Sequence, residues 1–143
     1  MYLNLVLGTV LIATTVVTHT FGLMAVTRAM GFLTARLRMH GHRSRTLAII
    51  ITVLGIFCVR TVEVWIWAAA HLLVGSASDF ETALYFSTAT FSTVGYGDVV
   101  PAHQWRLLAA LEGINGFLLI GWSTAYLVAA GIRVGPFRAG EHF

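Results

Sequence analysis

The residues of this sequence best suited to chemistry lie together in Ser92–Asp98, which reads Ser-Thr-Val-Gly-Tyr-Gly-Asp. Gly95 and Gly97 stand at alternating positions and permit left-handed or otherwise unusual backbone angles. Successive carbonyl groups can then point the same way instead of alternating as in a strand. Four such rows around a common axis would form stacked rings of carbonyl oxygens, and the Thr93 hydroxyl would add one ring at the inner end. Such rings can replace the water shell of a potassium ion.

A short helix is predicted immediately before this segment, over Phe80–Phe91. Ser78 is the expected N-cap residue and Glu81 the N3 residue of a capping box, while Asp79 adds negative charge at the positive end of the helix dipole. About a dozen residues cannot span a bilayer core of about 30 Å, and the Ser and Thr content suits a re-entrant segment sheltered by protein. We expect the helix to run inward and to point its partly negative C-terminal end toward the middle of the membrane, where that end favours a cation.

Three longer apolar stretches must position this segment, and each exceeds the roughly 20 helical residues that cross a bilayer. They are Tyr2–Val26, Leu47–Val74 and Leu107–Ile132. The composition agrees, because 57% of the 143 residues are apolar and only 10% are charged, against about a quarter in a soluble domain. The first stretch is predicted to be a retained helix rather than a signal peptide, since no basic residue precedes it. The predicted fold is therefore an all-α membrane protein with three transmembrane helices and one re-entrant helix.

Basic residues predict the orientation of these helices. Seven of the nine arginines lie in the connection 28–46 or in the tail 133–143, and they are Arg28, Arg36, Arg38, Arg43, Arg45, Arg133 and Arg138. The positive-inside rule then places both segments in the cytoplasm and places the N-terminus and residues 75–106 outside. We expect the arginines of the connection to rest on anionic lipid, each contributing about 1 kcal/mol. The net charge of +3 is too small to indicate a nucleic-acid partner.

The sequence Thr93–Asp98, with a short helix before it and membrane-length helices on both sides, resembles the pore domain of tetrameric potassium channels. The resemblance covers roughly Leu47–Ile132 and leaves the first helix unexplained. It implies a homotetramer in the plasma (inner) membrane of a prokaryote, with potassium as the permeant ion and no cofactor. The predicted divisions are an extra helix over 1–27, a cytoplasmic loop over 28–46, a pore domain over 47–132 and a tail over 133–143.

The resemblance also implies roles for individual residues. Potassium is expected at Thr93, Val94, Gly95 and Tyr96; the ion-coordinating filter is expected to comprise Thr93, Val94, Gly95, Tyr96 and Gly97, with Asp98 at the outer mouth. Pore helices of this family often carry adjacent tryptophans where this chain has Tyr85 and Phe86. Tyr85 retains a hydroxyl donor, so a hydrogen bond from Tyr85 to Asp98 is predicted as a support for the filter.

Two residues of the last helix are further candidates. Glu112 is expected to support the pore helix through Ser87 or Thr90 or to pair with His71, with a partner on the first helix as an equal alternative. Gly116 is the candidate gating hinge, although a small residue at a helix interface needs only a packing reason.

Two charged residues of the second helix, Arg60 and Glu63, are three positions apart and should form a local pair. That pair has either a structural role or a role in gating or proton linkage. His19 in the first stretch is expected to be incidental.

The predicted function is passive, selective conduction of potassium. The alternatives are a nonselective cation channel and a nonconducting regulatory or structural membrane subunit. An enzyme is not predicted, because no nucleophile with a base, metal cage or phosphate loop occurs at usable spacing.

Overall fold

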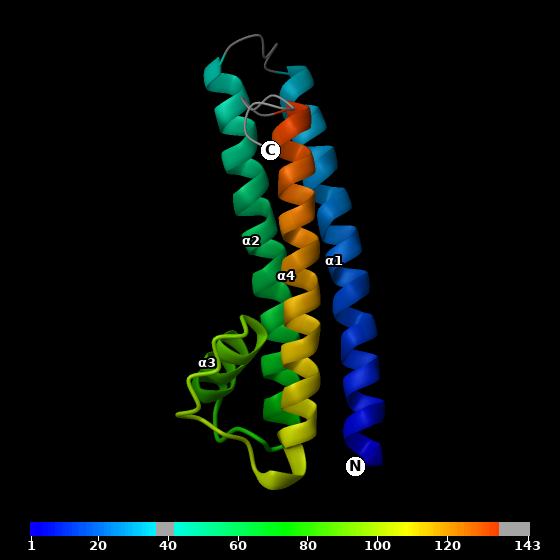
Figure 1. Cartoon of the computed structure of the whole chain (residues 1–143), viewed down its shortest axis with the longest axis vertical. Helices are drawn as coiled ribbons and strands as arrows, with labels where there is room; N and C mark the ends of the chain where they lie inside the picture. The colour runs from blue at the N-terminus through cyan, green and yellow to red at the C-terminus, as the bar shows by residue number, and fades with distance from the viewer. Residues whose placement is uncertain (37–41, 135–143) are drawn as a thin grey trace.

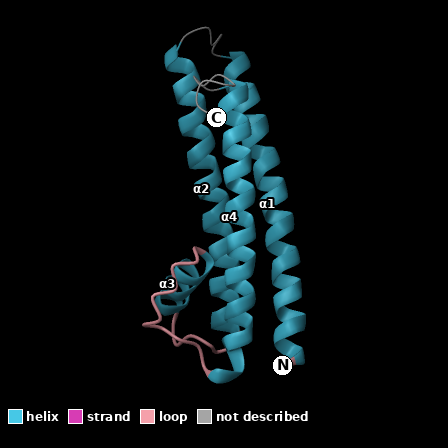
Figure 2. Ribbon diagram, viewed as in Figure 1, coloured by secondary structure: helices cyan, strands magenta, loops and turns pink. Residues whose placement is uncertain are grey.

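The protein is a bundle of long helices with one short helix at its side. A computed structural model describes residues 1–36 and 42–134, with side chains described for 1–32 and 45–133. The elements in chain order are α1 (Tyr2–Arg36), α2 (His42–Leu73), α3 (Phe80–Phe91), the 3-10 turn η1 (His103–Trp105) and α4 (Arg106–Val134). Figure 2 shows helices and loops and no strand among these described residues. Three helices are long and apolar enough to cross a membrane, which confirms the expected all-helical membrane class.

The helices extend further into the first connection than the sequence predicts. The helices continue past the predicted divisions at 27/28 and 46/47, since α1 ends at Arg36 and α2 begins at His42. Residues 28–36 contain Arg, Ala, Met and Leu, which are good helix formers, and no proline. Long arginine side chains can also continue a helix beyond the apolar core of a bilayer. The side chains of Arg36 and Arg43, the whole of Arg38 and residues 135–143 lie outside the described residues.

The short helix α3 has the predicted bounds but a different N-cap. Asp79, not Ser78, is the N-cap residue, and its carboxylate accepts hydrogen bonds from the Thr82 backbone at 2.9 Å and the Thr82 hydroxyl at 2.8 Å. Ser78 instead donates its hydroxyl to Asp79 at 2.6 Å. Hydrogen bonds from Ser78 and then from Thr82 lower the pKa of Asp79 to about 2. The carboxylate therefore satisfies the helix start and stays charged there, which explains why it takes the place predicted for the serine.

Figure 1 shows α1, α2 and α4 side by side, with α3 next to one end of α2 and α4. The first residues of α1 lie at that same end, where the Asn4 side chain donates to the backbone oxygen of Gln104 at 2.6 Å. The N-terminus and the segment 75–106 thus share one end of the bundle, as the arginine distribution predicts. The fully buried side chains of Trp67, Phe91, Leu108 and Leu119 form the core between the helices.

Close packing of α1 on α2 depends on small residues. A Cβ added to Gly22 of α1 would lie 2.5 Å from a methyl group of Val59, and one added to Gly55 of α2 would lie 2.8 Å from a methyl group of Val26. Each glycine therefore accepts a β-branched side chain of the other helix. Such contacts are a main source of helix association in membranes, where lipid removes much of the hydrophobic driving force.

Gly22→Ala is expected to lower the free energy of unfolding by about 1–3 kcal/mol, because the new methyl group overlaps Val59. Thermal unfolding in detergent micelles would measure the change. Gly31→Ala is the matched control on the same helix, since its added Cβ meets no heavy atom within 4 Å among the described residues outside its own backbone. Equal stability of the two variants would contradict the packing role of Gly22.

Candidate functional site

The segment after α3 has an alternating backbone conformation. Thr93, Gly95 and Gly97 have positive φ angles of 65°, 51° and 78°, while Val94 and Tyr96 between them do not. Such alternation turns successive carbonyl groups toward a common side instead of opposite sides. Glycine adopts positive φ readily, but Thr93 is a β-branched residue for which this conformation is rare and strained. The strain at Thr93 makes this segment a candidate functional site.

Hydrogen bonds to the C-terminal end of α3 hold this segment in place. The backbone N–H of Thr93 donates to the Thr90 oxygen and that of Gly95 donates to the Ala89 oxygen, both at 3.0 Å. The structure thus brings Thr93–Asp98 to the end of α3, as the sequence predicts. Val94 and Tyr96 remain 53% and 74% exposed in the single chain. Ion coordination by these residues stays a prediction.

Tyr85 and Asp98 connect the middle of α3 to the end of the segment. The Tyr85 hydroxyl donates to the Asp98 carboxylate at 2.6 Å, so the predicted contact is present. This hydrogen bond lowers the pKa of Asp98 below its ordinary value of 3.8 and raises the pKa of Tyr85 above 10.0. The two residues border a cavity of about 310 Å³ between α3 and the segment. Asp98 is therefore held in its charged form.

A buried pair behind α3 joins α2 to α4. His71 Nε2 lies 2.9 Å from Glu112 Oε2, and both side chains are fully buried. The other ring nitrogen of His71 contacts the Ser76 hydroxyl at 2.7 Å, and Phe86 of α3 packs edge-on against the ring. Of the expectations for Glu112, pairing with His71 is confirmed. Its other oxygen has no hydrogen-bond partner in the described part of the chain, although Ser87 is close enough to interact with the carboxyl.

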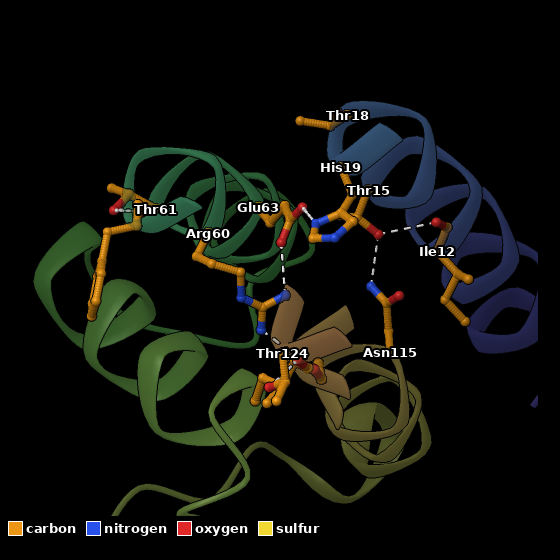
Figure 3. Close-up of polar contacts among 12 residues, drawn as sticks. Ile12, Thr15, Thr18, His19, Arg60, Thr61, Glu63, Asn115 and Thr124 are labelled. Carbon is orange, nitrogen blue, oxygen red and sulfur yellow. Dashed lines mark hydrogen bonds and ion pairs between the residues drawn. The ribbon is translucent and has the colours of Figure 1, made fainter. Parts of the chain in front are cut away.

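The contact to α1 that was expected as an alternative for Glu112 comes instead from Asn115. Its amide donates to the Thr15 hydroxyl at 2.7 Å, and both residues are buried. Figure 3 shows this bond beside the cluster around Glu63.

Gly116 lies where α4 touches the end of α3. A Cβ at this position would overlap the backbone oxygen of Phe91, the last residue of α3. Glycine is therefore required for the close approach of the two helices. α4 runs through Gly116 without interruption, and a hinge role for this residue remains a prediction.

Arg60 and Glu63 form the predicted pair, with Arg60 Nη1 2.8 Å from Glu63 Oε2. The expectation that His19 is incidental is wrong, because its Nδ1 lies 2.8 Å from the other Glu63 oxygen and both side chains are fully buried (Figure 3). The contact was missed because the two residues are 44 positions apart on different helices. The usable signal was chemical: a histidine within a membrane-length apolar helix needs a polar partner.

A short capped helix, a segment with alternating backbone angles held at its end and two membrane-length helices packed against the short helix are the features expected of a multi-pass membrane channel. The chain belongs to the ion channel family, whose model matches residues 57–133, more than half of the sequence. This match confirms the predicted pore-domain resemblance and, like it, does not include α1.

A calcium-gated potassium channel, TvoK of Thermoplasma volcanium, is 38% identical over 64 residues. The alignment covers 44% of this chain and 18% of TvoK, so the chain corresponds to a small part of that relative. No solved structure matches the chain.

Tyr85→Phe is expected to raise the pKa of Asp98 toward 3.8, because the main cause of its lowering is the Tyr85 hydroxyl. A lowered folded-state pKa stabilises the fold above the ordinary pKa, and that contribution is lost as the pH falls through the lowered value. In the variant the pKa of Asp98 is nearer its ordinary value, so this contribution to stability should be smaller and should be lost at a higher pH than in the parent. Carbon-13 NMR titration of Asp98 would measure the shift, and an unchanged midpoint would contradict the hydrogen bond.

His71→Leu is expected to cost about 3 kcal/mol of stability, because it leaves the Glu112 carboxyl buried without its histidine. The double variant His71→Leu/Glu112→Leu should cost less, since the buried carboxyl is then absent. Denaturant titration in micelles, followed by tryptophan fluorescence, would compare them. If the stability loss of the double variant equals the sum of the losses of His71→Leu and Glu112→Leu, the two residues do not act as a pair.

Proposed function

We propose that the protein is a potassium-selective channel that conducts K⁺ passively through a filter built from the Thr93–Gly97 segments of four copies. The observation that carries the proposal is the alternating positive φ at Thr93, Gly95 and Gly97, which suits a row of carbonyl groups facing one axis. The similarity of this chain to a stretch of the potassium channel TvoK supports the choice of ion.

In this proposal the ion loses its water shell to protein oxygens. The backbone oxygens of Thr93, Val94, Gly95 and Tyr96, with the Thr93 hydroxyl, replace it. The C-terminal end of α3, which carries about −0.5 charge, stabilises a cation below the filter. Because its low pKa keeps Asp98 ionised, four copies of this residue would concentrate cations at the outer mouth.

Exposed apolar residues support assembly into a homotetramer. Val94 and Tyr96 are largely exposed in one chain, and a single row of carbonyl groups cannot surround an ion. On α4, Ile114, Phe117 and Leu118 are 61–70% exposed. Neighbouring copies would cover both surfaces, and α3 would then be a re-entrant helix sheltered from lipid.

The orientation follows from the arginines. We place the N-terminus and the filter outside and the C-terminus in the cytoplasm of the plasma membrane, with anionic lipid around Arg28 and Arg45. Arg28 lies in the last turns of α1 and Arg45 in the first turn of α2, and these ends of α1 and α2 are opposite to α3 in Figure 1.

Reconstitution in a planar bilayer under a potassium-to-sodium gradient tests the function. The reversal potential should move toward the potassium equilibrium potential, and barium should abolish the current. A robust current that reverses near zero would indicate a nonselective cation channel. Tetramers without current under all tested conditions would indicate a nonconducting subunit.

Gly95→Ala, with matched control Gly75→Ala, tests the role of the filter backbone. Both glycines have positive φ, of 51° and 69°, so alanine is strained at either position. Only Gly95→Ala is expected to abolish selective conduction, because Gly75 lies in the turn after α2. Equal loss in both variants, measured by the same reversal-potential recording, would show that general backbone strain is the cause.

A further inference from the structure

The helix α1 lies outside the matched residues 57–133, yet it contributes a fully buried histidine to a charged cluster within the bundle. His19 Nδ1 lies 2.8 Å from Glu63 Oε1, and Glu63 Oε2 lies 2.8 Å from Arg60 Nη1. Arg60 Nη2 also donates to the Gly116 oxygen at 3.3 Å. Figure 3 shows His19, Glu63 and Arg60 in one line from α1 across α2 toward α4. The cluster therefore joins α1, α2 and α4 through side chains.

Arg60 lies against the end of α3 that is proposed to face the ion. Its guanidinium carbon is 4.5 Å from the ring centre of Phe91, the last residue of α3. The end of a helix carries about −0.5 charge, whereas a guanidinium carries a full positive charge. An uncompensated Arg60 would reverse the sign of the field that this helix end provides. The filter therefore needs a negative charge next to Arg60.

Glu63 supplies that charge, and His19 fixes its orientation. An ionised carboxylate only accepts hydrogen bonds, so the imidazole donates from Nδ1 to one oxygen while Arg60 donates to the other. Trp122 of α4 packs on the His19 ring, with ring centres 5.1 Å apart. The charges of Arg60 and Glu63 sum to zero, which suits a site inside a membrane.

We propose that Glu63, oriented by His19 of α1, is a positioning residue for potassium conduction. It acts through Arg60, whose charge it cancels at the inner end of the filter. Arg60 then fastens α2 to Gly116 and Phe91 without repelling the permeant ion. The inference rests on the proposed channel function, and it gives the helix outside the family match a role in the pore.

Single-channel recording of reconstituted tetramers at low potassium concentration tests the proposal. Glu63→Gln leaves one uncancelled positive charge in each subunit, and we expect the potassium conductance to fall about tenfold while the reversal potential stays unchanged. The double variant Arg60→Met/Glu63→Gln removes both charges, so it should restore most of the lost conductance. Thermal unfolding of the same samples separates this effect from stability, because the double variant should be less stable than the parent and still conduct.

Three results would overturn the proposal: an unchanged conductance in Glu63→Gln tetramers, an equal loss in the single and double variants, or a large rise in sodium permeability. If Glu63→Gln does not assemble, Arg60→Met alone decides. It leaves the Glu63 carboxylate uncancelled, so its potassium conductance at low potassium concentration should equal or exceed that of the parent, whereas a tenfold loss would show that Arg60 itself is required.

His19→Leu tests the contribution of α1. It removes the hydrogen bond that orients Glu63, and its conductance should fall between those of the parent and Glu63→Gln. A conductance equal to that of the parent would overturn the role of α1. Absence of potassium-selective current from the parent protein itself is a different result, because it overturns the proposed function and the inference that rests on it.

Discussion

Charged side chains inside an apolar bundle must find partners within the protein, and this constraint organises the described helices. Two carboxyl groups, those of Glu63 and Glu112, are fully buried, and each contacts a buried histidine of another helix. A buried carboxyl group without a partner is costly. Because each pair joins two helices, the need to keep the carboxyl group paired also fixes how these helices pack. His19–Glu63 joins α1 to α2, and His71–Glu112 joins α2 to α4 behind α3.

The short helix α3 and the segment after it depend on both pairs. His71 packs against Phe86 near the middle of α3, while Arg60 covers the ring of Phe91 at its end. Gly116 allows α4 to approach the Phe91 backbone, which no residue with a Cβ could do without a shift. α3 is thus held near its middle and at its C-terminal end, and the strained backbone at Thr93 begins directly after the contact at Phe91. A rigid support of this kind is what a strained conformation needs in order to persist.

The sequence was informative where a feature is local. Length and composition predict the membrane helices, and the bounds of α3 follow from its Ser- and Thr-rich apolar run. The Arg60–Glu63 pair could also be predicted from spacing along the chain, and the Tyr85–Asp98 contact from the resemblance to the family. The N-cap of α3 was predicted one residue too early, because serine and aspartate are both good caps and only geometry decides between them.

Features that depend on distant residues could not be obtained in this way. Thr15 looks ordinary in an apolar helix, and His19 indicates that it has a polar partner but not which one. Their partners Asn115 and Glu63 are 100 and 44 positions away. The family match to residues 57–133 omits one side of such a contact, so it does not include every residue on which the matched segment depends. The matched segment contains a buried Glu63 whose second hydrogen-bond partner lies in α1, outside the match. A buried carboxyl that loses such a partner becomes costly, so α1 and the pore domain of this chain are joined by the chemistry of Glu63.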